Sequence, residues 1–207
     1  MKTVERRILV LYAHPSHERS EVNRPLARAT RRISDITFVD LYGEYPTSDI
    51  DIDVEQARLR EHDVIVFMFP MYWYSTPAIL KEWQDLVLEY GFAYGEGGTA
   101  LRGKVFLASL TTGGPEDAYS TEGYNRFTIR ELLAPLEQTA RLCGMRYIAP
   151  FVLHGARRAA EEGRVGAHVA EWRQVLAALR EGRLDIEAAG KVSHLNADID
   201  ALMKEES

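Results

Sequence analysis

The chain has 207 residues, of which 46% are hydrophobic and 27% are charged, and its formal net charge is −6 at pH 7. This length is typical of one domain with a substantial core, and the acidic balance argues against nucleic acid as a partner, because binding a phosphate backbone needs a basic surface. The single cysteine, Cys143, excludes an internal disulfide framework, and neither a membrane-spanning apolar run nor a signal peptide is recognisable, so we expect a cytoplasmic protein.

Apolar runs and segments of helical spacing alternate along the sequence. Five apolar runs predict parallel strands, which are buried on both faces: Ile8–Tyr12, Ile36–Leu41, Val64–Phe69, Lys104–Leu110 and Tyr147–Leu153. Five segments with helical spacing predict the helices that follow these strands: Glu21–Ile33, Val54–His62, Pro77–Tyr90, Phe127–Cys143 (bent near Pro135) and Val165–Arg180. Turn-rich stretches predict loops at Tyr42–Ile52, Gly91–Gly103 and Gly113–Gly123.

This alternation predicts an α/β fold with a doubly wound parallel sheet. The right-handed crossover rule and the length of the chain favour a flavodoxin-like, five-stranded sheet with strand order 2-1-3-4-5. We expect one domain over residues 1–184. The segment 185–207 is mostly polar and only weakly amphipathic, and we interpret it as an appendage whose role the sequence does not indicate.

Three unusual segments follow the first, third and fourth predicted strands, which are neighbours in this order. Residues 14–23 read HPSHERSEVN, residues 70–77 read PMYWYSTP, and residues 111–114 read TTGG. Loops at the carboxyl ends of neighbouring strands converge on one crevice, where ligands bind. A polar loop that opens a helix suits a phosphate, and aromatic side chains with nearby glycine backbone suit a flat ring. Together the three segments indicate a site for flavin mononucleotide (FMN).

Each segment also has a purely structural interpretation. Ser20 could simply cap a helix, the aromatic run could form a core corner, and the Thr-Thr-Gly-Gly segment could be a tight turn. The consecutive aromatics at 72–74 cannot all face inward, so at least one is expected to be exposed or to face a ligand. Zinc at His14 and His17 would lack a third ligand. The glycine patterns of Rossmann sites, phosphate loops and hydrolase elbows are absent from the sequence.

A resemblance to a known protein family, carried by longer stretches of sequence, supports the flavin interpretation. The chain resembles the NAD(P)H:quinone oxidoreductase family of flavodoxin-like flavoproteins, and within it the bacterial ancillary proteins of glutathione-regulated potassium efflux. The resemblance covers most of the chain, from residue 8 to residue 154. It is carried by Leu11-Tyr12-Ala13-His14-Pro15 with Ser20 and Asn23, Pro70-Met71 with Trp73-Tyr74-Ser75, Lys81 with Trp83, Ala93-Tyr94-Gly95, Gly97-Gly98-Thr99-Ala100-Leu101 and Thr111-Thr112-Gly113-Gly114.

The resemblance implies a role for each segment. The flavin phosphate would be held by His14, Ser20, Glu21, Val22 and Asn23. The rest of the flavin would be held by Pro70, Met71, Tyr72, Trp73, Tyr74, Thr111, Thr112, Gly113 and Gly114. Tyr119 would be a catalytic residue that stabilises charge on the reduced flavin, and Tyr94 and Asn125 would line the substrate site, with Tyr94 reaching across a dimer interface. Asn125 stands where relatives have a histidine, and an amide cannot take up a proton near neutral pH.

These implications describe an FMN-dependent NAD(P)H:quinone oxidoreductase, homodimeric and without a metal, that passes hydride from NAD(P)H to a quinone or similar acceptor. FMN is expected rather than FAD because the loop Tyr42–Ile52 is short. The alternative function is that of a flavin-binding regulatory subunit for a glutathione-gated potassium efflux transporter, located at the inner face of the membrane. An electron-transfer flavodoxin is disfavoured by the long loops 91–103 and 113–123.

Overall fold

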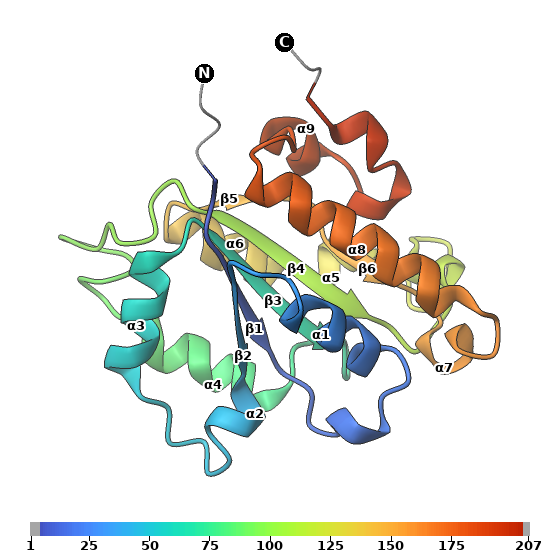
Figure 1. Cartoon of the computed structure of the whole chain (residues 1–207), viewed down its shortest axis with the longest axis horizontal. Coiled ribbons are helices and arrows are strands. Elements are labelled where there is room, and N and C mark those ends of the chain that lie inside the picture. The colour runs from blue at the N-terminus through green and yellow to red at the C-terminus, as the bar shows by residue number, and fades with distance from the viewer. Residues whose placement is uncertain (1–4, 205–207) are drawn as a thin grey trace.

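The central sheet sets the buried apolar runs side by side as parallel strands (Figure 1). The computed structural model describes residues 5–204. Its sheet runs in the order β2 (Ile36–Asp40), β1 (Ile8–Tyr12), β3 (Val64–Pro70) and β4 (Val105–Thr111). Two short strands, β5 (Arg146–Tyr147) and β6 (Phe151–Leu153), both pair with β4 and together fill the fifth position. The flavodoxin-like order 2-1-3-4-5 is therefore confirmed.

The fifth strand differs from the prediction because it is interrupted between β5 and β6. Pro150 has no N–H with which to continue the ladder, and its carbonyl accepts a hydrogen bond from Leu195 N at 2.8 Å. Beyond the break, Val152 N donates to Asn196 Oδ1 at 3.0 Å, and Asn196 Nδ2 donates to Val152 O at 2.8 Å. The Asn196 amide thus takes the place of a further strand at this edge of the sheet.

Helices cover both faces of the sheet, and Figure 1 shows α1 and α8 lying together on one of them. This face carries α1 (Asn23–Arg31) and α8 (Arg164–Arg180), and the other carries α3 (Ile52–Glu61), α4 (Ala78–Val87) and α6 (Ala134–Leu142). Trp172 Nε1 donates to Thr30 Oγ1 at 2.9 Å, so the buried indole of α8 has a polar partner on α1. Within residues 5–204, every helix is too short or too polar to span a bilayer.

Four shorter helices complete the described chain: α2 (Leu41–Glu44), α5 (Ile129–Leu132), α7 (Ala156–Ala159) and α9 (Ile186–Lys191). The helix predicted over residues 127–143 is in fact the pair α5 and α6. Pro135 occupies the first turn of α6, where its missing N–H costs nothing but where it cannot continue α5. The stretch predicted as a loop over residues 42–52 contains most of α2, and α7 had no predicted counterpart.

The described part of the extension packs against the sheet layer instead of standing away from it as an appendage. Its apolar side chains are buried in the same cluster as those of α1 and α8: Ile186, Ala189, Leu195, Ile199 and Leu202. Asp185 caps α9 by accepting hydrogen bonds from Glu187 N and Ala188 N. The segment therefore covers the β5–β6 edge of the sheet and adds to the core of the preceding domain.

Candidate functional site

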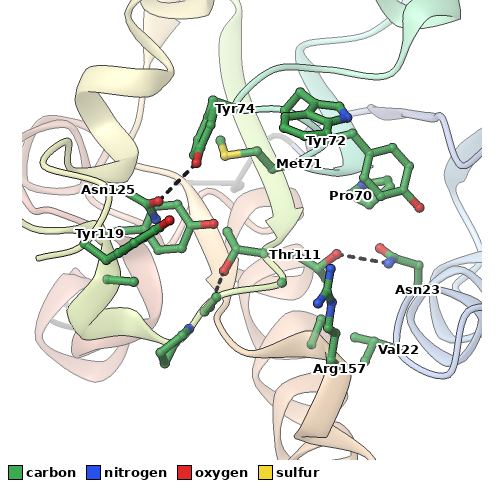
Figure 2. A pocket seen from close by; sticks show the side chains of 18 of the residues that line it. Val22, Asn23, Pro70, Met71, Tyr72, Tyr74, Thr111, Tyr119, Asn125 and Arg157 are labelled. Atoms are coloured by element: carbon green, nitrogen blue, oxygen red, sulfur yellow. Dashed lines mark hydrogen bonds between the residues drawn. The ribbon is translucent and has the colours of Figure 1, made fainter.

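The carboxyl ends of β1, β3 and β4 open into one cavity of about 1240 Å³ (Figure 2). In the parallel register Pro70 lies beside Thr111, and the end of β1 lies beside β3, so the loops that follow these strands are neighbours. Every residue predicted to bind the cofactor lines this cavity: His14, Ser20, Glu21, Val22, Asn23, Pro70, Met71, Tyr72, Trp73, Tyr74, Thr111, Thr112, Gly113 and Gly114. Tyr119 and Asn125 line it as well, whereas Tyr94 does not.

The loop before α1 carries a buried amide at the cavity wall. Asn23 is only 3% exposed, and its Nδ2 donates to Thr111 Oγ1 at 3.0 Å, which joins the start of α1 to the end of β4. Ser20 Oγ accepts a hydrogen bond from Asn23 N at 2.9 Å, as a capping serine does. Asn23 Oδ1 is buried without a partner in the described residues. A buried amide that lacks one partner is a position where a ligand can complete the hydrogen bonding.

His14 presents a neutral ring to the same end of the cavity. Its Nδ1 accepts a hydrogen bond from Ser16 N at 3.1 Å, so the ring hydrogen lies on Nε2, which is left as a donor. Burial, with a smaller contribution from His17, lowers the pKa of His14 below its ordinary value. Among the described residues no cluster of three His, Cys, Asp or Glu side chains is arranged to hold a metal ion.

The aromatic segment forms a tight turn with unusual backbone angles. Tyr72 and Ser75 exchange two backbone hydrogen bonds, of 3.1 and 3.0 Å, across Trp73 and Tyr74. Trp73 has φ 48° and Tyr74 has φ 64°, as in a type I′ turn, where Asn and Gly are normally preferred. Trp73 is 93% exposed, in agreement with the expectation that the three aromatics do not all face inward. Bulky residues held at positive φ store strain, and such strain is concentrated at functional sites.

The wall opposite this turn is built from the Thr-Thr-Gly-Gly segment and the loop after it. Thr112 is buried, and its Oγ1 donates to Gly114 O at 2.9 Å. The Tyr119 ring lies against Gly114, where an added Cβ would be 3.3 Å from Tyr119 Cε2. Tyr74 OH donates to Asn125 Oδ1 at 3.2 Å, and Figure 2 shows these two side chains meeting across the cavity. Asn125 thus links the aromatic turn to the loop that carries Tyr119.

The residues near the cavity that sequence reasoning missed include His154 and Arg157, which follow the last strand. His154 Nδ1 lies 3.3 Å from Thr112 Oγ1, and the His154 ring lies 5.6 Å from that of Tyr119. Burial lowers the pKa of His154, although Glu116 opposes this shift. Arg157 of α7 lines the cavity beside Gly113. β6 ends beside β4, with Leu153 paired to Thr111. The rule that loops at the carboxyl ends of neighbouring strands converge on one site therefore also applies to the loop after β6.

Tyr94 lies in a separate glycine-rich loop. Its ring makes an edge contact with Tyr90, with the ring centroids 5.8 Å apart, and its carbonyl accepts a hydrogen bond from Gly91 N at 2.8 Å. Within one chain, therefore, Tyr94 contacts residues of its own loop and does not line the cavity. Its predicted place beside a substrate depends on a second copy of the chain.

Comparison with known proteins agrees with this fold. The family model described as "Flavodoxin-like fold" matches residues 6–176. The glutathione-regulated potassium-efflux system ancillary protein KefG of Serratia proteamaculans is 51% identical over 152 residues, which are 73% of this chain and 83% of that protein. General stress protein 14 of Treponema denticola, solved in complex with FMN, has 36% identity and a TM-score of 0.79, covering 84% of this chain and 99% of that one. An NADPH-quinone reductase from P. pentosaceus has 30% identity and a TM-score of 0.74, covering 82% of this chain and 97% of that one.

Proposed function

We propose that this chain, which belongs to the family of proteins with a flavodoxin-like fold, is an FMN-dependent NAD(P)H:quinone oxidoreductase. The observation that carries the proposal is the single cavity at three strand ends, which combines a buried amide, glycine backbone and aromatic side chains. Similarity to a protein solved with FMN and to one named as an NADPH-quinone reductase supports it.

The loop before α1 fits the phosphate of FMN. Within the described residues, the backbone N–H groups of Glu21 and Val22 have no hydrogen-bond acceptor. They lie at the start of a helix of nine residues, where the helix dipole favours an anion. A half-turn of the Asn23 amide group exchanges its nitrogen and oxygen, so Nδ2 can donate to the phosphate while Oδ1 accepts from the Thr111 hydroxyl. His14 Nε2 adds a neutral donor.

The space between the Thr-Thr-Gly-Gly segment and the aromatic turn fits the flat ring. Within residues 5–204, the backbone N–H groups of Gly113 and Gly114 also lack acceptors, and both residues are small enough to let a ring approach. Tyr72 and Tyr74 bring aromatic faces to the same space, and Met71 lies between them in Figure 2. The Tyr119 hydroxyl, beside Gly114, is a donor for negative charge that develops in the transition state.

Bound FMN supplies the hydride-transfer chemistry between a nicotinamide and a quinone, and the chain supplies binding, orientation and electrostatics. The Tyr74–Asn125 hydrogen bond holds the aromatic turn against the Tyr119 loop, which shapes the open side of the cavity. This opening is where NAD(P)H and the quinone would bind in turn.

The test is the visible spectrum of the purified protein, followed by anaerobic addition of NADH or NADPH. We expect a flavin spectrum that bleaches on addition and recovers when a quinone is added. Cofactor released by heat should run as FMN on chromatography. A colourless protein that takes up no FMN would refute the proposal, and release of FAD as the main species would refute the choice of cofactor.

A second candidate function is that of a flavin-binding regulatory subunit for a potassium efflux transporter. It is favoured by the relatives near 50% identity, which are named as ancillary proteins of such a system. A transporter gene beside the gene for this chain, and binding of the holoprotein to that transporter, would support it. Efficient quinone turnover without any transporter partner would favour the enzyme.

A further inference from the structure

The helix α7 fixes one arginine beside the proposed phosphate loop. Val22 of that loop packs with Leu153 and Ala159 in a small buried cluster, against which Ala156 also packs. The helix is therefore attached directly to the loop that precedes α1. In Figure 2 Arg157 rises from α7 between Val22 and the end of β4.

Backbone hydrogen bonds attach the start of α7 to the glycine segment as well. Gly155 N donates to Gly114 O at 2.7 Å, and Ala156 N donates to Thr112 O at 2.8 Å. The Arg157 side chain consequently lies over Gly113, where an added Cβ would be 3.5 Å from Arg157 Nε. The backbone of α7 is thus fixed, and the guanidinium lies where the phosphate loop and the Thr-Thr-Gly-Gly segment meet.

Arg157 has no ion-pair partner in the described part of the chain. No carboxylate there forms an ion pair with it, whereas the adjacent Arg158 pairs with Glu162 at 2.9 Å. The carboxylates that line the cavity are Glu21, Asp117 and Glu122, so the lining itself is not basic overall. An unpaired guanidinium at the wall of such a cavity is suited to an anionic ligand.

Arg19 is the other arginine of the lining, but the element that carries it is less buried. It belongs to the 3-10 turn His17–Arg19, which has no buried residue, whereas α7 is anchored through the buried Ala159. A cation on an anchored element has less freedom to lose when it binds a ligand.

We propose that Arg157 binds the phosphate of FMN and makes the site select phosphorylated over unphosphorylated flavin. This inference rests on the proposed function, because it assumes that FMN occupies the cavity. The guanidinium would add a charge-assisted contact to the neutral donors of Glu21, Val22 and Asn23, which by themselves do not balance a dianion.

The test compares FMN and riboflavin as ligands of the full chain after its flavin has been removed. Flavin fluorescence titrations would be made with the wild type, Arg157→Ala, Arg157→Lys and the matched control Arg158→Ala. Loss of a hydrogen-bonded charge predicts that Arg157→Ala weakens FMN binding by about 10- to 100-fold. Riboflavin binding should change less than about twofold, Arg157→Lys should restore part of the FMN affinity, and Arg158→Ala should match the wild type for both ligands.

The outcomes separate this inference from the function on which it rests. Equal FMN affinity for Arg157→Ala and Arg158→Ala would overturn the inference and leave the proposed function standing. Equal losses for FMN and riboflavin would also overturn it, because Arg157 would then act on the fold or on the ring. Failure of the wild type to bind FMN would refute the proposed function itself. Thermal unfolding of the flavin-free variants would verify that each is folded.

Discussion

Replacing Trp73 by Asn should make the flavin-free protein more stable while weakening its hold on flavin. Trp73 occupies the first central position of the Tyr72–Ser75 turn with φ 48°, and its side chain is 93% exposed. In the left-handed region a residue with a large side chain is disfavoured by about 1–2 kcal/mol, and Asn is disfavoured by less. Because the exposed indole contributes little burial, relief of this strain should dominate the change in the free energy of unfolding.

We expect Trp73→Asn to raise that free energy by about 1 kcal/mol, and for a chain of this length the melting temperature should rise by about 2–4 °C. The matched control is Trp73→Ala, which removes the indole but keeps a residue disfavoured at positive φ. Both variants lose an aromatic side chain that lines the cavity, so both should bind FMN less tightly. Denaturant unfolding of the flavin-free variants measures the free energy of unfolding. Equal stability of the Asn and Ala variants would refute the strain argument.

Three other predictions concern chemistry, acid stability and assembly. Tyr119→Phe should slow flavin reduction by NAD(P)H in stopped-flow experiments with little effect on FMN affinity, because in the proposed mechanism its hydroxyl donates to developing charge. Asn125→His is the matching gain test, and unchanged rates in both variants would exclude this loop from the chemistry. Burial lowers the pKa of His168 to about 4, so protonation of this histidine favours the unfolded chain. The free energy of unfolding should therefore fall by up to about 3 kcal/mol as the pH drops from 6.5 toward 4, and His168→Phe should remove this pH-dependent loss. Identical acid dependence of the wild type and the variant would contradict this. Light scattering should show a dimer, because Trp73, Tyr90 and Tyr124 are exposed aromatic residues that a second copy of the chain can cover. A fully active monomer would exclude a substrate site shared between two copies.

The strands were predictable because burial on both faces leaves a continuous apolar run. Ile8–Tyr12 has the same limits in the sequence and in the structure. The predicted fifth strand was wrong in detail because Pro150 interrupts it, and the carbonyl of Pro150 accepts a hydrogen bond from Leu195, a residue of the extension about forty-five positions away. Such a long-range hydrogen bond leaves no local pattern in the sequence.

The extension was misread for a related reason. Helical periodicity is detectable only over several turns, but α9 has six residues, and the segments that follow it are 3-10 turns of three residues. The apolar residues of these short elements have no regular spacing, and yet Leu195 and Leu202 are buried. Burial in this part of the chain is imposed by the edge of the sheet and not by a local pattern.

The predicted site residues came together because one topological rule governs the loops after β1, β3 and β4. Arg157 and His154 were missed because the same rule was not applied to the loop after β6. The short α7 could not have been found by periodicity, since it is only four residues long and follows Gly155, whose φ is 64°.

Once assembled, the loops of the cavity are fixed by contacts that join one strand end to another. Asn23 bonds Thr111, Tyr74 bonds Asn125, and the start of α7 bonds the backbone of Thr112 and Gly114. None of these bonds lies within a single loop, so the free N–H groups of the site keep their positions without a ligand. We therefore expect this site to lose less ordering entropy when it binds FMN, which would let a set of mostly neutral donors hold a charged cofactor.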